Sequence, residues 1–259
     1  MSSPSLIVVA GPSGGGKTTW IIQQLKHSTH PTFYFSPGLG LITVDLAHVN
    51  YTCPAVQVIG GDQEKSWLTN LPRNALVYCE LGVHIDLNSA LFDPWPCRRL
   101  AVLPPCLTDS EWHRWADEII PGNDFFPENA ESLPNNLWRS PLTGMVFDPP
   151  SLEMILAELT GGAYGELQRL KGIFEMPDGR AFYIDFVQGL TGVEYTELSL
   201  DPWLEGRPQR FSGIELAGWN LNQKLIADTL MEGCLSNEIL THYQQQYKNL
   251  NPLEEAITG

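Results

Sequence analysis

The sequence has few basic side chains and no long apolar run. Only 15 of its 259 residues are lysine or arginine, against 30 aspartate or glutamate, which gives a formal net charge of −15. A nucleic-acid backbone selects clustered positive charge, so we expect no nucleic-acid partner. No stretch of 18 apolar residues is present, and the first residues lack the basic region and apolar core of a signal peptide. We therefore expect no membrane partner and a cytoplasmic location.

Cysteine is also scarce, and its spacing is irregular. The sequence holds five cysteines, an odd number, and no two of them form a C-x-x-C pair. A disulfide framework is typical of short secreted chains with an even number of cysteines. The pattern therefore predicts reduced thiols at Cys53, Cys79, Cys97, Cys106 and Cys234.

What the sequence does have is a glycine-rich segment near its start. An apolar run at residues 6–10 precedes this segment, and a helix pattern at residues 18–26 follows it. The segment matches G-x-x-x-x-G-K-[ST] at every position, so we predict a phosphate-binding loop between a buried parallel strand and a helix. A chance match is the alternative, and the flanking strand and helix count against it. The residues predicted to bind the nucleotide are Gly11, Pro12, Ser13, Gly14, Gly15, Gly16, Lys17, Thr18 and Thr19.

The residue types of this loop suit a triphosphate. Glycines lack a Cβ atom, so successive backbone N–H groups can converge on one anion. Lys17 adds a positive charge for the β and γ phosphates, and the Thr18 hydroxyl can ligate Mg²⁺. The loop therefore predicts a nucleoside triphosphate and Mg²⁺ as ligands, with Lys17 as a catalytic residue.

A second candidate side chain follows a later strand pattern. Residues 75–79 form an apolar run that ends in Glu80. The carboxyl ends of parallel strands meet at the sheet edge where the phosphate loop also lies, so Glu80 can reach Mg²⁺ or its water shell. The alternative is a carboxylate that only caps a surface turn. We predict that Glu80 is both a catalytic residue and a metal ligand.

The order of the apolar patterns predicts two domains. Residues 1–140 are predicted to form an α/β nucleotide-binding domain with a mostly parallel sheet and flanking helices. Residues 141–240 are predicted to form a smaller α+β domain with an antiparallel sheet, because strand patterns joined by turns lie between helix patterns at 151–159 and 221–234. Residues 241–259 are expected to form a tail with a short helix at most.

Three further stretches of the first domain carry local signals. Residues 41–44 form a short apolar run. Residues 108–116 are predicted to form a helix capped by Thr108 or Asp109. Residues 121–136 are rich in Pro, Asn and Glu and are expected to form a long loop.

The two halves together resemble the CobW-like P-loop GTPases, within the group that includes the HypB and UreG metallochaperones. The loop of this family usually reads G-x-x-G-x-G-K-T-T, and residues 11–19 match it at every position. In the second half, three segments resemble the R-x-K-G, F-Q-G-V and closing-strand motifs of the family. These segments are Arg169 to Gly172, Phe186 to Leu190 and Arg210 to Gly218.

The resemblance implies a GTPase that couples the state of its nucleotide to metal delivery or to a client protein. It implies that Lys17 and Thr18 hold phosphate and Mg²⁺. It also implies that Asp45 is the switch aspartate and a metal ligand, and that Glu80 is the glutamate of the E-x-x-G motif. Asp124 stands where the N-K-x-D motif of the family reads guanine. GTP and Mg²⁺ are therefore the expected cofactors, with ATP as the alternative nucleotide.

The sequence departs from the family pattern at three places. The C-x-C-C metal motif is missing, and Cys53 is the one cysteine in its interval, whereas a soft metal site needs two or more thiolates or imidazoles. The N-K-x-D motif is reduced to Asp124. The segment from Glu80 to Gly82 is one residue shorter than E-x-x-G. These departures indicate a shortened, divergent member of the family.

Three functions stay open on the sequence. The first is Mg²⁺-dependent hydrolysis of a nucleoside triphosphate that switches the interaction with a client protein. The second is a degenerate member that binds nucleotide without hydrolysis and acts as a regulatory or assembly scaffold. A small-molecule kinase is the third, and it is disfavoured because the 15 basic residues include no arginine-rich lid. The sequence predicts no particular oligomeric state.

Overall fold

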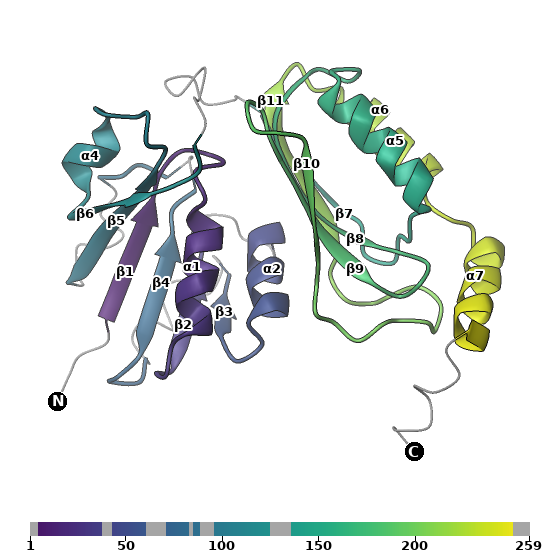
Figure 1. Cartoon of the computed structure of the whole chain (residues 1–259), viewed down its shortest axis with the longest axis horizontal. Coiled ribbons are helices and arrows are strands. Elements are labelled where there is room, and N and C mark those ends of the chain that lie inside the picture. Colours follow the sequence, from purple (N-terminus) through teal and green to yellow (C-terminus); the bar gives the residue numbers. More distant parts are fainter. Residues whose placement is uncertain are drawn as a thin grey trace. The chain divides into compact units, whose positions relative to one another are not determined.

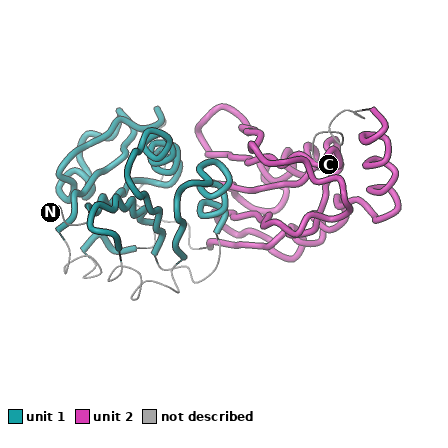
Figure 2. Tube along the Cα trace, turned by 90° about the horizontal axis from the view of Figure 1, so that it is seen from below, with its two compact units in different colours: residues 1–133 teal, residues 134–259 magenta. Residues whose placement is uncertain are grey.

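The computed structural model describes residues 5–37, 43–60, 71–82, 85–88, 96–124 and 136–250. The chain divides into two compact units, residues 1–133 and 134–259, which Figure 2 shows in different colours. The predicted fold class is confirmed, because an α/β unit with a parallel sheet precedes an α+β unit with an antiparallel sheet.

Unit 1 is built on a six-stranded sheet whose neighbouring strands all pair in parallel, in the order β3-β2-β4-β1-β5-β6. β1 and β4 lie side by side, with Val9 opposite Glu80. The loop that follows β1 and the side chain of Glu80 therefore emerge at the same edge of the sheet. The strands are β1 (Ser5–Ala10), β2 (Thr32–Phe35), β3 (Gln57–Ile59), β4 (Leu76–Glu80), β5 (Cys97–Leu103) and β6 (Glu118–Pro121).

Helices cover both faces of this sheet. α1 (Lys17–Lys26) and α2 (Val44–Thr52) share a buried cluster with Tyr34 and lie next to each other in Figure 1. α4 (Glu111–Trp115) packs its two tryptophans against the cluster that contains Phe33. Because side chains alternate between the faces of a strand, Tyr34 points toward α1 and α2 while Phe33 points to the α4 side.

Helix α2 is where unit 1 differs most from the sequence prediction, which expected only a short apolar run at residues 41–44. The buried residues of α2 are nearly consecutive, so no period of 3.6 residues marks the helix in the sequence. Thr43 caps it, with its side chain accepting a hydrogen bond from the Leu46 N–H at 3.2 Å. Asp45 therefore lies in the first turn of a helix.

The predicted helix at residues 108–116 is present but shorter. α4 begins after Ser110, which is its N-cap residue, so the predicted caps at Thr108 or Asp109 were wrong. Of the long loop that was expected after β6, residues 125–135 lie outside the described residues.

The boundary between the units lies nearer the N-terminus than predicted. The chain divides after Leu133 and not after residue 140. The reason is β7 (Asn136–Pro141), which pairs with β11 (Gly213–Trp219) and so belongs to the sheet of the second unit.

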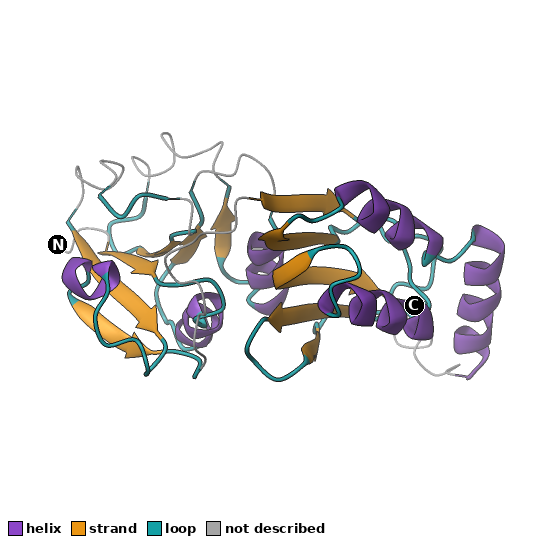
Figure 3. Cartoon of the chain, turned by 90° about the horizontal axis from the view of Figure 1, so that it is seen from above, coloured by secondary structure: helices purple, strands orange, loops and turns teal. Residues whose placement is uncertain are grey.

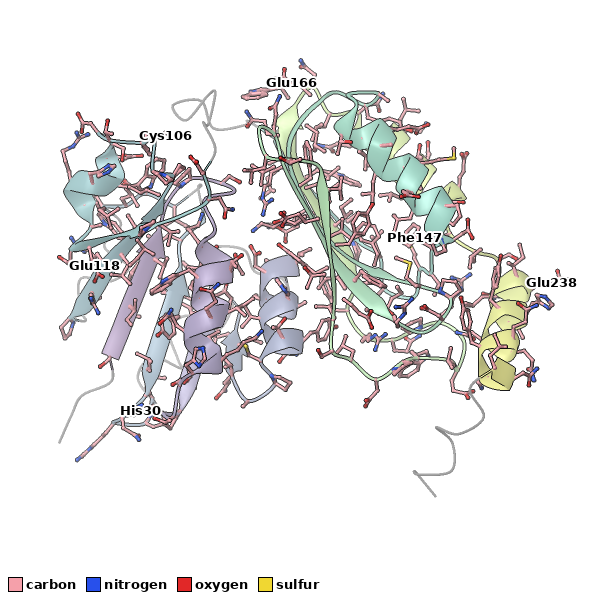
Figure 4. All side chains as sticks on the ribbon, viewed as in Figure 1. His30, Cys106, Glu118, Phe147, Glu166 and Glu238 are labelled. Carbon is pink, nitrogen blue, oxygen red and sulfur yellow. The ribbon has the colours of Figure 1, made fainter. Side chains whose placement is uncertain are left out.

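Unit 2 is built on a five-stranded antiparallel sheet in the order β10-β9-β8-β11-β7, drawn in orange in Figure 3. Helices α5 and α6 cover one face of it (Figure 1). The core lies between these helices and the sheet. In it Phe147, labelled in Figure 4, packs edge to face against Phe174, with ring centroids 5.5 Å apart. The remaining elements are β8 (Glu166–Glu175), β9 (Ala181–Val187), β10 (Val193–Glu197), α5 (Pro149–Thr160) and α6 (Gln223–Glu232).

The end of the chain is more ordered than predicted. Helix α7 spans Asn237–Leu250, where a tail with at most a short helix was expected from residue 241. Gln244 is buried, and its amide accepts from the Gly206 N–H and donates to the Gly206 carbonyl, each at 2.9 Å. This pair of bonds fixes α7 on unit 2. Among the described residues, no helix is both long enough and apolar enough to span a bilayer.

Candidate functional site

The glycine-rich segment forms a tight turn between β1 and α1. Gly14 and Gly16 have φ angles of 79° and 94°, in the left-handed region that other residues rarely adopt. The Gly15 N–H donates to the Pro12 carbonyl at 3.2 Å, which closes the turn. A turn of this kind points successive N–H groups inward, and the first N–H groups of α1 have no partner within the helix. The segment is therefore shaped to bind an anion at the start of α1.

Lys17 brings the positive charge of the site. Its ammonium group is held by the loop itself, donating to the Gly11 carbonyl at 3.0 Å and to the Pro12 carbonyl at 3.0 Å. The side chain is only 8% exposed, so the charge is fixed within the loop. An ammonium group in a concave set of N–H groups strengthens the attraction for phosphate.

Thr18 lies between two carboxylates that come from distant parts of the sequence. Its hydroxyl donates to Glu80 Oε1 at 3.0 Å and lies 3.4 Å from Asp45 Oδ1. Thr18 is in the first turn of α1, Asp45 is in the first turn of α2, and Glu80 ends β4. The structure thus brings together the three residues that were predicted to bind the metal.

The donor set around Thr18 fits Mg²⁺. It consists of one hydroxyl and two carboxylates, and Mg²⁺ is usually held by one or two carboxylates together with water and phosphate oxygens. This set contains only two carboxylates. A group of three or more His, Cys, Asp or Glu side chains that could hold a metal ion does not occur in the part of the chain that the structure describes.

Tyr34 makes a contact with Glu80 that the sequence analysis missed. Tyr34 is fully buried near the end of β2, and its hydroxyl donates to Glu80 Oε2 at 2.8 Å. Burial, followed by the charges of Glu80 and Asp45, raises the pKa of Tyr34 well above its ordinary value. The phenol therefore stays protonated and acts as a donor.

The loop is also held from the end of β6. The Asn123 side chain donates to the Gly14 carbonyl at 2.8 Å, and its backbone N–H donates to the Gly15 carbonyl at 3.2 Å. A Cβ atom on Gly122 would lie 2.2 Å from the Gly15 carbonyl oxygen, so this approach requires glycine. Asp124, which was predicted to contact the base, follows Asn123 and is exposed. The contact residue in this segment is thus Asn123, which the sequence analysis did not single out.

The other loop residues take different positions. Ser13 is half-buried in the turn, and Thr19 is exposed on α1. Pro12 lends its carbonyl both to Lys17 and to the turn. Pro12 and Ser13 belong to the segment between β1 and α1, and Thr19 belongs to the first turn of α1; all three lie in the stretch that was predicted to bind the nucleotide.

In unit 2, the residues that carry the family resemblance make contacts within the sheet. Arg169 on β8 donates to Asp185 on β9, with Nη2 at 2.9 Å from Oδ2. Arg210 binds both carboxylate oxygens of Glu175 at 2.7 Å, and Glu175 is fully buried. These ion pairs stabilise the unit rather than line a reactive site.

The sequence matches no protein-family model and no curated protein. Among solved structures, the Zn(II)-bound YjiA GTPase from E. coli is 13% identical, with 90% of this chain and 99% of that chain covered and a TM-score of 0.31. A Zn(II)-bound triple mutant of YjiA GTPase gives the same values. At this identity and TM-score, neither structure places the chain in a family.

Proposed function

We propose that unit 1 binds a nucleoside triphosphate as its Mg²⁺ complex and hydrolyses it. The observation that carries this proposal is the position of Thr18. Its hydroxyl opens the helix after a phosphate-binding turn and lies within 3.4 Å of two carboxylates from separate elements. A phosphate site and an oxygen-lined Mg²⁺ site thus share one residue, which is the arrangement that phosphoryl transfer requires.

In this proposal the chain contributes mainly position and charge. The N–H groups of the loop bind the phosphates, and Lys17 balances charge on the β and γ phosphates. Thr18, Asp45 and Glu80 would hold Mg²⁺, which supplies further neutralisation of the phosphate oxygens when it is bound. Fixing the substrate against preorganised donors lowers the barrier without covalent chemistry by the protein.

We propose GTP as the nucleotide, with ATP as its competitor. Asn123 ties the segment at residues 122–124 to the carbonyl of Gly14, so a base bound beside this segment would lie next to the loop. In such a position Asp124 could accept hydrogen bonds from the N–H groups of guanine. Adenine does not present the same pair of donors, so the preference for GTP depends on Asp124.

We further propose that the nucleotide state switches the interaction with a client protein, of the metallochaperone or assembly-factor kind. Asp45 is both a proposed metal ligand and a member of the first turn of α2. A shift of Asp45 on binding or loss of Mg²⁺ and the γ-phosphate would therefore move the start of a helix. Helix α2 is the element through which the site would signal.

A second candidate function is nucleotide binding without hydrolysis, in a regulatory or assembly scaffold. The observation that favours it is the environment of Glu80, which is 5% exposed and accepts a hydrogen bond at each carboxylate oxygen. Both oxygens of Glu80 thus already make contacts with side chains of the protein, which favours a structural role for this carboxylate over activation of a water. The two functions predict the same binding site and differ only in turnover.

Phosphate release separates the two functions. The protein incubated with GTP and Mg²⁺ should release phosphate, and Lys17→Ala should reduce the rate by about 100-fold or more. Lys26→Ala, at the exposed end of the same helix, is the matched control and should keep the wild-type rate. If the folded wild type releases no phosphate above the Lys17→Ala variant while binding GTP, hydrolysis is excluded and the scaffold function stands.

A further inference from the structure

We infer that Tyr34 is a positioning residue for Glu80 at the proposed Mg²⁺ site. The inference rests on the proposed function. It gives each oxygen of the Glu80 carboxylate its own role, one toward Thr18 and the metal position and the other toward Tyr34. Oε1 accepts from the Thr18 hydroxyl at 3.0 Å, and Oε2 accepts from the Tyr34 hydroxyl at 2.8 Å.

The sheet register explains why Tyr34 reaches Glu80. Tyr34 on β2 lies opposite Tyr78 on β4, and Glu80 is two residues further along β4. Residues two apart in a strand point to the same face, so Tyr78 and Glu80 share a face. Tyr34 and Tyr78 belong to the same buried cluster, which also contains residues of α1 and α2. The phenol thus lies on the face that carries Thr18 and Asp45.

A tyrosine suits this task because it donates one hydrogen bond and carries no charge. The fully buried ring has little freedom to move, so the direction of its hydroxyl is fixed by packing. A carboxylate held at one oxygen presents the other in a constant direction. Glu80 is therefore oriented toward Thr18 and the metal position, while its second oxygen accepts from the phenol.

The same arrangement refines the role of Glu80. A general base needs a carboxylate oxygen within hydrogen-bond reach of the water that it activates. Oε2 is engaged by Tyr34, and Oε1 is directed at Thr18. Glu80 thus acts on the metal and its ligands, and Tyr34 acts through Glu80.

The test is Tyr34→Phe, which keeps the ring and removes only the hydroxyl. Equilibrium binding of GTP is measured while Mg²⁺ is titrated, and again with Mg²⁺ chelated. The Mg²⁺ concentration for half-maximal binding should rise about tenfold, because a hydrogen bond to a charged acceptor is lost. Affinity for GTP in the chelated sample should stay within about twofold of wild type, because Tyr34 does not touch the phosphate loop.

Tyr78→Phe is the matched control. Tyr78 is the register partner of Tyr34, is buried in the same cluster, and packs edge-on against Trp20 with ring centroids 6.1 Å apart. The substitution removes the same atom and should leave the Mg²⁺ titration unchanged. An equal shift in both variants would mean that lost packing, rather than Glu80, causes the effect, and would overturn the inference.

A second background makes the test specific for Glu80. In Glu80→Gln, adding Tyr34→Phe should change the Mg²⁺ titration by less than about twofold, because the carboxylate that Tyr34 orients is gone. A tenfold shift in both backgrounds would contradict the inference. The free energy of unfolding of wild type, Tyr34→Phe, Glu80→Gln and the double variant is then measured without nucleotide or metal. The effects of the two substitutions should again be non-additive, which tests the Tyr34–Glu80 coupling even if the wild type binds no nucleotide. Absence of GTP binding would overturn the proposed function, whereas additive unfolding effects would overturn the inference.

Discussion

The Thr18 hydroxyl lies 3.0 Å from Glu80 Oε1, although 62 residues separate Thr18 and Glu80 in the sequence. Thr18 belongs to the phosphate loop and Glu80 ends β4, the strand beside β1, so their contact joins the phosphate part and the metal part of the proposed site. The contact also links the phosphate loop to Tyr34, which holds the other oxygen of Glu80. Predictions about the site therefore concern a connected set of groups.

Thr18→Ala should remove most of the effect of Mg²⁺ on nucleotide binding. The variant loses a proposed metal ligand and leaves Asp45 and Glu80 without the hydroxyl between them. We expect the Mg²⁺ concentration for half-maximal GTP binding to rise about 10- to 100-fold. Thr29→Ala, in the exposed loop after α1, is the matched control. Unchanged Mg²⁺ dependence in folded Thr18→Ala would contradict the assignment of Thr18 as a ligand.

Asn123→Ala should weaken the binding of GTP and ATP to a similar degree. The side-chain hydrogen bond to the Gly14 carbonyl holds the phosphate loop, and both nucleotides use that loop. Loss of one such bond costs about 1 kcal/mol, or about fivefold in affinity. Calorimetry with the two nucleotides measures the effect. A loss confined to one nucleotide would show that Asn123 contacts the base instead.

Asp124→Ala is the complementary variant at the adjacent position. Asp124 is exposed and is proposed to accept from guanine, so its removal should lower the affinity for GTP and leave that for ATP unchanged. We expect the preference for GTP over ATP to fall about tenfold, as for a lost hydrogen bond to a charged group. If wild type and variant show the same ratio of affinities, Asp124 does not read the base.

Arg210→Ala should destabilise unit 2 severely. Arg210 binds both oxygens of Glu175, whose side chain is fully buried, so the variant leaves a buried carboxylate without this cation. We expect the free energy of unfolding to fall by about 3–5 kcal/mol. Arg180→Ala removes an arginine that is 48% exposed and should cost about 1 kcal/mol or less. Equal losses in chemical denaturation would contradict the structural role given to the Arg210–Glu175 pair.

The sequence predicted the parts of the site that have a local signal. The phosphate loop, the strand before it and Glu80 at the end of β4 follow from residue types within a few positions of each other. Tyr34 and Asn123 were missed because their contacts join residues 46 and 109 positions apart. Nothing near either residue in the sequence distinguishes it from an ordinary strand or loop residue.

Two helices were not predicted correctly, each for its own reason. Helix α2 buries nearly consecutive residues, so the period of 3.6 residues that indicates a surface helix is absent. The polar sequence of α7 gave no sign of burial, yet Gln244 satisfies both of its amide groups on Gly206, 38 residues earlier. Burial of a polar side chain depends on a partner that only the folded chain supplies.

In the proposed function, residues 11–19 bind the phosphates of a nucleotide together with Mg²⁺. Calorimetric titration of the full chain with GTP, with and without Mg²⁺, tests it most directly. We predict binding at one site, an affinity at least about tenfold higher with Mg²⁺, loss of binding in Lys17→Ala and retention in Lys26→Ala. If the folded wild type bound neither GTP nor ATP, or if Lys17→Ala bound GTP as tightly as the wild type, the proposed phosphate site would be contradicted.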